Sequence, residues 1–146
     1  MKELICKPIG YIQSPYQTRE TTPKSGDEYP DQEAMMEISE EYAEAMADME
    51  AGKKYEVLFW FDKVPDVKLK VPFRGVGPMM GIFSTHAPYR PNPIGASVVT
   101  VTKIEGQRIY FTGVDMMDGT PVLDIKPFDF QVGKYIPWII YSWRDG

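Results

Sequence analysis

The sequence predicts a mainly β domain, either a barrel or a sandwich, with one short helix. Apolar runs rich in β-branched and aromatic residues are short and closely spaced along the chain. Only one segment, at about residues 39–51, repeats its apolar side chains with the period of a helix. A length of 146 residues fits one domain, so we expect a single domain over residues 1–146 with no C-terminal extension domain.

Strands are expected where apolar residues alternate or where β-forming residues run together. The run at 55–61, Tyr-Glu-Val-Leu-Phe-Trp-Phe, is apolar at nearly every position, which is typical of a strand buried on both faces. Glu105-Gly106 predicts a hairpin turn, and Asp118-Gly119 predicts the turn before the last strand. The full set of expected strands is 7–14, 33–38, 55–61, 66–71, 79–84, 97–104, 108–112 and 121–125.

The expected helix begins at Ser39, which can cap its amino terminus, and continues through Glu40 and Glu41, whose charge suits the first turn. Gly52 is expected to end it. Its apolar residues share one face at helical spacing: Tyr42, Ala45, Met46 and Met49. This stripe is typical of the core face of an amphipathic helix, and a cofactor-binding segment is the alternative.

Two long loops separate these elements. Residues 15–32 are rich in Pro, Thr, Lys, Gly and Asp without an apolar period, and such loops tend to be functional or mobile. The second loop, residues 81–95, contains three prolines between positions 88 and 95, which fix the backbone around Arg90 and Asn92. A rigid backbone preorganises this cation and this amide, which favours a functional site over a plain turn. The residues alone name no ligand.

Composition and missing motifs argue against several classes of function. The net charge of −5 argues against nonspecific nucleic-acid binding, and the single cysteine, Cys6, allows no intramolecular disulfide, as in reducing cytoplasm. No apolar run approaches the roughly 18 residues that span a membrane, and glycine-rich phosphate or dinucleotide motifs are missing. Asp115, Asp118 and Asp124 could hold a hard cation, but roles at a turn and at strand ends are favoured, so no metal site is expected.

Three stretches, in order, carry a resemblance to a known family. They are Ile-Gly-Tyr-Ile-Gln-Ser-Pro-Tyr at 9–16, Gly-Ile-Phe-Ser-Thr leading to Arg-Pro-Asn-Pro-Ile-Gly within 81–95, and Asp-Gly-Thr-Pro-Val-Leu-Asp-Ile-Lys-Pro-Phe at 118–128. With them, roughly residues 8–130 resemble the TsaA-like family, also called the TrmO family. The resemblance implies a single-domain β-barrel, here with one short amphipathic helix (about residues 39–51) and long functional loops. It also implies S-adenosylmethionine as cofactor and a homodimer that methylates N6 of threonylcarbamoyl-adenosine at position 37 of tRNA.

By motif position, the resemblance also implies the residues that contact the cofactor. They are Lys24, Ser25, Gly26, Phe61, Asp62, His86, Ala96, Val114, Asp115, Met116 and Met117. The sequence departs from the family pattern in three ways. His86 stands where the family usually has Arg, Asp62 stands where His is frequent, and the chain ends shortly after the barrel whereas longer members carry a further domain. His86 is interpreted as a cofactor or substrate contact, with an exposed loop histidine as the alternative.

Methyl transfer to an adenosine N6 needs in-line approach and a proton acceptor, because the amine lone pair is conjugated into the ring. Asp115 and Asp124 are the candidate acceptors, and an ion pair with Lys126 or Arg90 is the alternative role for each. Arg90 completes the candidate catalytic set, and the candidate substrate contacts are Arg90, Asn92 and Lys126.

A local basic face for RNA is a further hypothesis, and the solvated side of an alternating strand is the alternative for its first two members. The residues concerned are Lys68, Lys70, Arg74, Arg90, Lys103 and Arg108. Two other functions stay open beside tRNA methylation. One is a methyltransferase of the same fold that acts on a small molecule or another base, and the other is a non-catalytic module that binds S-adenosylmethionine.

Overall fold

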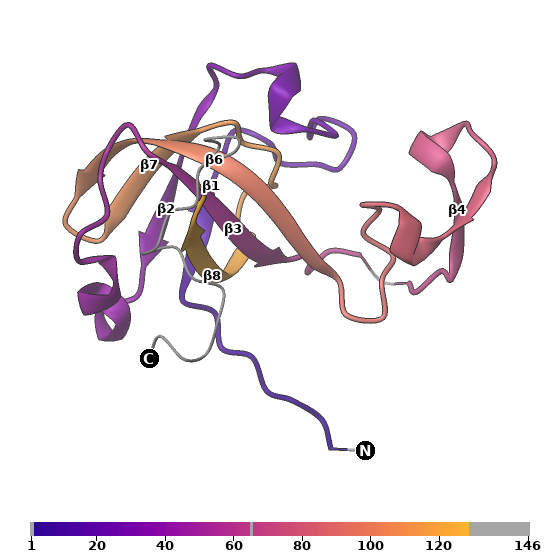
Figure 1. The fold of residues 1–146 in the computed structure, drawn as a ribbon, viewed down its shortest axis with the longest axis horizontal. Helices are drawn as coiled ribbons and strands as arrows, with labels where there is room; N and C mark the ends of the chain where they lie inside the picture. The colour runs from indigo at the N-terminus through magenta and orange to yellow at the C-terminus, as the bar shows by residue number, and fades with distance from the viewer. Residues whose placement is uncertain (1, 65, 129–146) are drawn as a thin grey trace, which may run out of the picture.

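The computed structural model describes residues 2–64 and 66–128 of the chain. Six of its strands close into one antiparallel barrel in the order β1-β2-β7-β6-β3-β8, and β8 pairs back onto β1 (Figure 1). Closure gives every barrel strand a neighbour on both sides, which protects sheet edges. The barrel strands are β1 (Gly10–Gln13), β2 (Glu33–Ile38), β3 (Lys54–Trp60), β6 (Ile94–Glu105), β7 (Arg108–Thr112) and β8 (Pro121–Pro127). The prediction of a mainly β barrel is therefore confirmed, and the sandwich alternative is wrong.

Strand β3 lies between β6 and β8 and shows how the core is built. Tyr55, Val57 and Phe59 are buried, whereas the residues between them are half-buried on the outer side. The prediction that this strand is buried on both faces is wrong, because only the inner face of a barrel meets the core. The inward residues form one cluster: Ile12, Ala34, Met36, Ile38, Tyr55, Val57, Phe59, Val99, Val101, Ile109, Phe111, Val114, Met116 and Val122.

The expected helix is present but shorter and more tightly wound. It is the 3-10 helix η2 (Glu40–Met46), and the Ser39 side chain at its start makes no capping hydrogen bond. It ends before Gly52 because Ala47 already has an extended backbone, with ψ of 139°. The apolar stripe does serve the core: Tyr42, Met46 and Met49 pack against the barrel, whereas Ala45 is exposed.

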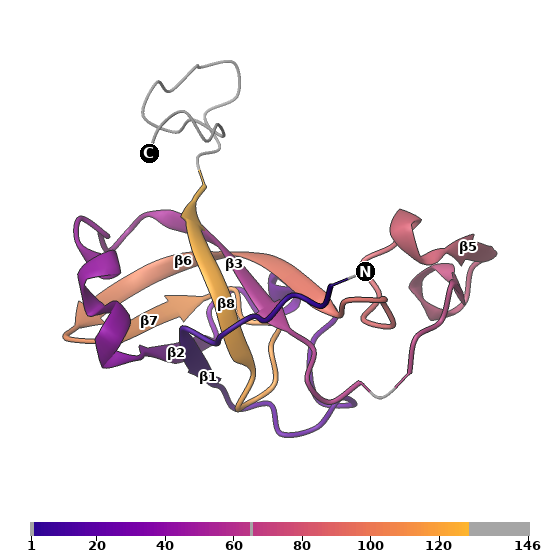
Figure 2. The same ribbon diagram turned by 90° about the horizontal axis from the view of Figure 1, so that it is seen from below.

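Between β3 and β6 the chain leaves the barrel and forms a projection, which we call the arm (residues 66–93). In Figures 1 and 2 the arm extends to one side of the barrel. It contains a two-stranded sheet of β4 (Lys70–Pro72) and β5 (Met79–Gly81) and the short 3-10 helices η3 (Phe73–Gly75) and η4 (Ile82–Ser84). The expected strands at 66–71 and 79–84 are thus reduced to three residues each, because the arm has only a small buried core, Val71 and Ile82.

Some barrel strands also differ from the expected strands in where they begin or end. Strand β6 begins at Ile94, three residues before its expected start, and β8 continues to Pro127. Residues 129–146 lie outside the described part of the chain. Among the helices within the described residues, none has the length and apolarity needed to cross a membrane.

Candidate functional site

The candidate site lies where the chain leaves β7 and runs beside β6. Strand β6 pairs with β3 from Ile94 to Thr100, but with β7 only from Thr100 to Glu105. The first half of β6 therefore has an edge that β7 does not cover. Gly113, with φ of 84°, turns the chain toward that edge, where a Cβ on Gly113 would lie 3.5 Å from the Val98 carbonyl oxygen.

Asp115 is the carboxylate that this turn places against β6. The Ser97 hydroxyl lies 2.7 Å from Oδ1 and 2.9 Å from Oδ2 of Asp115, so it donates to the carboxylate. Burial raises the pKa of Asp115 from 3.8 to about 6. Hydrogen bonds from Ser97 and from the backbone of Asp115 and Gly26 oppose the rise, whereas the nearby charge of Asp27 adds to it. A carboxyl that titrates near neutral pH is suited to accept a proton under physiological conditions.

The long loop at 15–32 reaches the same place through Gly26. A Cβ on Gly26 would overlap the carbonyl group of Gly113, so the two backbones touch and only glycine fits. Gly26 begins the 3-10 helix η1 (Gly26–Glu28), and Ser25 caps it by accepting a hydrogen bond from the backbone of Asp27 at 3.3 Å. Lys24 and Ser25 are exposed beside this contact. The predicted segments 24–26 and 114–117 therefore meet.

Much of the segment from Val114 to Met117 is used by the fold itself. The side chains of Val114 and Met116 are buried in the barrel core, at 0% and 1% exposure. The Met116 carbonyl accepts from the Ser14 hydroxyl at 2.7 Å, and the Met117 carbonyl accepts from the Thr120 hydroxyl at 2.6 Å. Asp115 is therefore the member of this segment whose side chain is placed for chemistry.

Of the remaining predicted cofactor residues, Phe61, Asp62 and Ala96 lie near the carboxyl end of the 81–95 loop, and His86 lies within the loop. Phe61 donates its backbone N–H to the Pro93 carbonyl at 2.7 Å and meets Phe59 edge to face. Asp62 follows it and is exposed. Ala96 pairs across the sheet with Leu58 and precedes Ser97. His86 is exposed at the far part of the loop.

Arg90 holds the 81–95 loop in shape. One guanidinium nitrogen, Nη1, donates to the carbonyls of Ile82, Thr85 and Ala87 at 3.1, 2.8 and 3.2 Å. Three convergent carbonyls are a strong set of acceptors for one cation, so this side chain fixes the turn that carries His86. Asn92 is exposed next to it. The described contacts of Arg90 are all within its own loop, and none of them involves Ser97 or Asp115.

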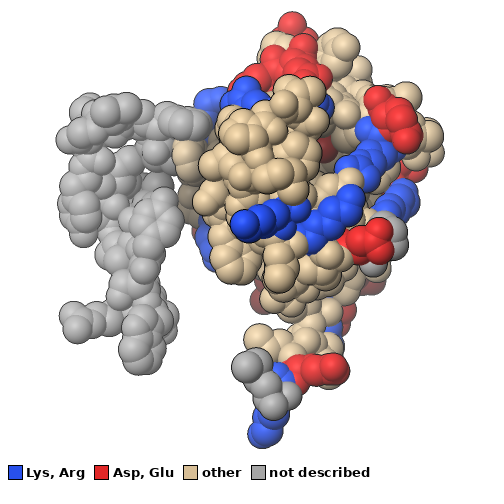
Figure 3. Space-filling model, turned by 90° about the vertical axis from the view of Figure 1, so that its right-hand side faces the viewer, with Lys and Arg blue, Asp and Glu red and all other residues tan. Residues whose placement is uncertain are grey.

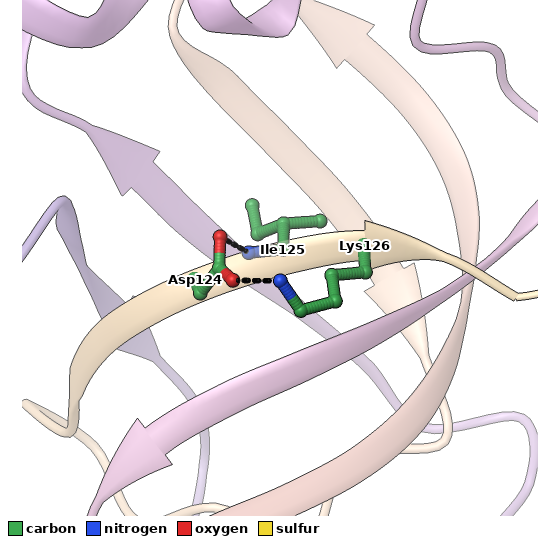
Figure 4. Close-up of polar contacts among 3 residues, drawn as sticks. All are labelled: Asp124, Ile125 and Lys126. Carbon is green, nitrogen blue, oxygen red and sulfur yellow. Dashed lines mark hydrogen bonds and ion pairs between the residues drawn. The ribbon is translucent and has the colours of Figure 1, made fainter. Parts of the chain in front are cut away.

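Asp124 and Lys126 form a separate pair on β8 (Figure 4). Lys126 Nζ lies 2.5 Å from Oδ2 of Asp124, and Oδ1 accepts from the backbone of Ile125 at 2.9 Å. The hydrogen bond and charge of Asp124 raise the pKa of Lys126. Strand β3 separates β8 from β6, so the structure does not bring Asp124 to Asp115. Of the alternatives left by the sequence, the ion pair with Lys126 is the one observed.

Sequence reasoning missed Ser97, the residue that fixes the Asp115 carboxylate. Its signal was its place directly after Ala96 and close to the family motif that ends at Gly95. No group of three or more His, Cys, Asp or Glu side chains gathers at a potential metal site within residues 2–64 and 66–128. Asp118 instead accepts from the backbone of Ser14 at 3.1 Å, which ties the 9–16 motif to the 118–128 motif.

A closed antiparallel barrel in which two loops bring Gly26 and Asp115 to Ser97 on β6 defines a β-barrel domain with a site at the edge of the barrel. Residues 11–132 match the family described as the tRNA-methyltransferase O N-terminal domain, and the chain belongs to that family. The resemblance inferred from the sequence is therefore confirmed.

Named relatives and a solved structure agree with this assignment. An S-adenosyl-L-methionine-binding protein of Archaeoglobus fulgidus is 36% identical over 88% of this chain and 92% of its own length. The mouse tRNA (adenine(37)-N6)-methyltransferase is 36% identical over 86% of this chain, but over only 31% of its own length. The crystal structure of TrmO from Pseudomonas aeruginosa superposes with a TM-score of 0.72 at 34% identity, covering 88% of this chain and 57% of that one. The chain thus spans about half of that TrmO structure.

Proposed function

We propose that the protein is an S-adenosylmethionine-dependent methyltransferase that methylates N6 of threonylcarbamoyl-adenosine at position 37 of tRNA. The cofactor and the reaction class are supported by relatives that are named S-adenosyl-L-methionine-binding proteins and methyltransferases. The tRNA substrate is supported by the name of the mouse relative and by the family to which the chain belongs.

The observation that carries the proposal is the contact of Asp115 with Ser97 beside Gly26. The junction consists of backbone groups, the Ser97 hydroxyl and the Asp115 carboxyl, with Lys24 exposed at its edge. Such a surface suits a ligand whose sulfonium is cationic, because it brings partial negative charge without a buried basic side chain. The residues present therefore fit the cofactor. When bound, S-adenosylmethionine supplies an electrophilic methyl group.

In this proposal the segments 24–26, 61–62 and 114–117, with His86 and Ala96, hold the cofactor. Asp115 is the proton acceptor in preference to Asp124, because its pKa of about 6 leaves it ionised yet basic near pH 7. A proton that leaves N6 as the new bond forms would pass to Asp115. Arg90 keeps the 81–95 loop rigid, so that Asn92 and His86 present fixed polar groups to the substrate.

Asp124 and Lys126 are proposed as a substrate-facing pair rather than as catalysts. Both side chains are about half exposed, and each partially neutralises the other. A polar pair on the outer face of β8 can bond a substrate hydroxyl or phosphate while remaining satisfied in its absence.

The homodimer implied by the family is also a proposal, and the arm supports it. Exposed apolar side chains gather there, and a concentration of this kind is typical of an interaction surface. They are Val67, Leu69, Phe73, Val76, Met79 and Phe83. Sedimentation velocity on the wild type and on Val76→Asp, whose wild-type side chain is 93% exposed, tests the proposal. A monomeric wild type would contradict it, and so would a variant that stays dimeric at the same concentration.

The name of one relative favours a second candidate. The Archaeoglobus fulgidus relative, 36% identical over 88% of this chain, is named for binding S-adenosyl-L-methionine rather than for methyl transfer. A module that binds the cofactor, or a methyltransferase for a small molecule or another base, is therefore the alternative function.

Two measurements separate these candidates. Calorimetry with S-adenosylmethionine tests the cofactor, and mass spectrometry of nucleosides from bulk tRNA incubated with protein and cofactor tests the substrate. N6-methylated threonylcarbamoyl-adenosine that appears with the wild type and not with Asp115→Asn is the expected result. Cofactor binding with unchanged tRNA would favour the alternative, and no binding at all would contradict both.

A further inference from the structure

A cluster of two cations around one tyrosine lies where the 15–32 loop meets the arm. The Arg19 guanidinium carbon lies 4.8 Å from the centre of the Tyr89 ring, and Arg19 Nη2 donates to the Tyr89 hydroxyl. Lys68 Nζ lies 4.3 Å from the same ring centre, and the Lys68 backbone N–H donates to the Tyr89 carbonyl at 2.9 Å. One aromatic ring thus holds two positive charges in place by cation–π contact.

These two charges have no acidic partner in the part of the chain that the structure describes. Within residues 2–64 and 66–128, no carboxylate forms an ion pair with Arg19 or Lys68, whereas Lys53, Lys103 and Lys126 each have one. Holding like charges near one ring without a counter-charge costs free energy in the free protein. Such an arrangement stores the electrostatic potential that an anion would relieve.

The distribution of charged residues along the sequence also favours anion binding at the cluster. Between Asp66 and Glu105 there is no Asp or Glu, although the stretch contains five Lys or Arg residues and the chain as a whole carries −5. All 21 acidic residues therefore lie outside this stretch. On the arm side of the molecule, Lys and Arg side chains form a band with acidic side chains toward its margins (Figure 3).

The basic face expected from the sequence is therefore divided. Lys68, Lys70, Arg74 and Arg90 belong to the arm, whereas Lys103 and Arg108 lie at the β6–β7 hairpin. The hairpin cation Lys103 is neutralised by Glu105 at 2.7 Å. Arg19, which the sequence did not suggest, joins the arm from a loop distant in sequence.

The geometry points to the Arg19–Tyr89–Lys68 cluster as a binding site for a backbone phosphate of RNA, which rests on the proposed tRNA substrate. A guanidinium and an ammonium next to each other can bond one phosphodiester, and phosphate contacts of this kind fix the position of a nucleic acid without reading its sequence. The loop that carries Arg19 continues to Gly26, which touches Gly113 at the candidate cofactor site. The phosphate site and the cofactor site are thus linked by one loop, so a bound RNA strand would be positioned relative to the transferred methyl.

Binding of full-length protein to bulk tRNA, measured by fluorescence anisotropy across a salt series, tests the inference. The variant is Arg19→Gln with Lys68→Gln. The matched control is Lys103→Gln with Arg108→Gln, which removes the same charges at the hairpin, where Lys103 also lies over a tyrosine, Tyr110, at 5.3 Å. Loss of this one phosphate contact should lower the slope of log K against log salt by about 0.7 to 0.9 and the affinity roughly fivefold or more near 0.1 M salt. The control should keep the wild-type slope.

Cofactor affinity by calorimetry should stay unchanged in both double variants, which shows that they are folded. The charge-preserving variant Arg19→Lys with Lys68→Arg should keep most of the RNA affinity. Equal slopes for wild type and the Gln variant would overturn the inference, and so would an equal loss in the control. Weaker binding to polyglutamate with unchanged binding to tRNA would overturn it as well, in favour of an acidic protein partner.

The proposed function and the phosphate site can be refuted independently of each other. If the wild type methylates tRNA and the Gln variant keeps its affinity and slope, only the phosphate site is wrong. If the wild type transfers no methyl group to tRNA, but its RNA affinity depends on Arg19 and Lys68, the phosphate site stands and the proposed substrate is wrong.

Discussion

Replacing Asp115 with Asn should stabilise the protein at alkaline pH while it removes methyl transfer. The folded state raises the pKa of Asp115 from 3.8 to about 6, so the native protein holds this proton more tightly than the unfolded chain. The contribution of this proton binding to the free energy of unfolding is complete below pH 3.8 and is lost as the pH rises through about 6. A shift of this size corresponds to roughly 3 kcal/mol, and partial exposure of the side chain lowers the expectation to about 2 kcal/mol.

Asn cannot ionise, and its amide oxygen can still accept from the Ser97 hydroxyl, which now donates at 2.7 Å. Wild type and Asp115→Asn should therefore have similar free energies of unfolding near pH 4, and the variant should be more stable by about 2 kcal/mol near pH 8. Urea unfolding followed by tryptophan fluorescence at pH 4, 6 and 8 measures the difference. The exposed substitution Asp62→Asn is the control and should show no such trend.

A difference between wild type and variant that stays flat from pH 4 to pH 8 would refute the burial argument. A variant that is less stable at pH 8 would refute it more directly, because the ionised carboxylate would then be stabilised by its surroundings. Full methyl transfer by Asp115→Asn would remove Asp115 as the proton acceptor whatever its effect on stability. Gain of stability with loss of activity is the expected signature of a functional site.

Three further substitutions test the surroundings of the site. Gly26→Ala should lower the urea midpoint and weaken cofactor binding because its methyl group would overlap Gly113, whereas Gly81→Ala, with open space around it, should do neither. Arg90→Ala should reduce methyl transfer far more than the free energy of unfolding, measured in parallel, since the three carbonyls it holds lie outside the barrel; equal losses would assign it a purely structural role. Asp124→Ala removes a half-exposed ion pair and should cost less than about 1 kcal/mol; steady-state kinetics should show a higher KM for tRNA, and a fall in kcat alone would restore Asp124 as a candidate acceptor.

The barrel strands were predictable because the residues that favour each strand are adjacent in sequence. Strands at 33–38 and 108–112 have the predicted ends, since each is a short and mostly apolar run that begins at a charged residue, Glu33 or Arg108. The length of the helix was overestimated, because the apolar stripe from Tyr42 to Met49 is typical of an α-helix. A short 3-10 helix followed by an extended Ala47 brings three of these side chains, Tyr42, Met46 and Met49, to the core. Local periodicity reports which residues face the core and leaves the winding undetermined.

The site was less predictable because its contacts are distant in sequence. The family motifs indicated 24–26 and 114–117, yet no local pattern shows that Gly26 touches Gly113 or that Ser97 bonds Asp115. For the same reason, the sequence alone did not distinguish Asp115 from Asp124 as the proton acceptor. Each is a carboxylate near a strand end, and only the strand order places β3 between them.

The position of the site follows from a difference in strand length. Strand β6 has 12 residues and β7 has five, so β7 cannot cover the first half of β6. Backbone groups on an open edge need partners, and residues 113–116 fold back along it. Asp115 is then pressed against Ser97, partially buried, by the same turn that places Val114 and Met116 in the core. Burial of Val114 and Met116 stabilises the folded barrel and holds Asp115 in a place that is unfavourable for its ionised form. The free energy of packing in the barrel therefore offsets the cost that raises the pKa of Asp115.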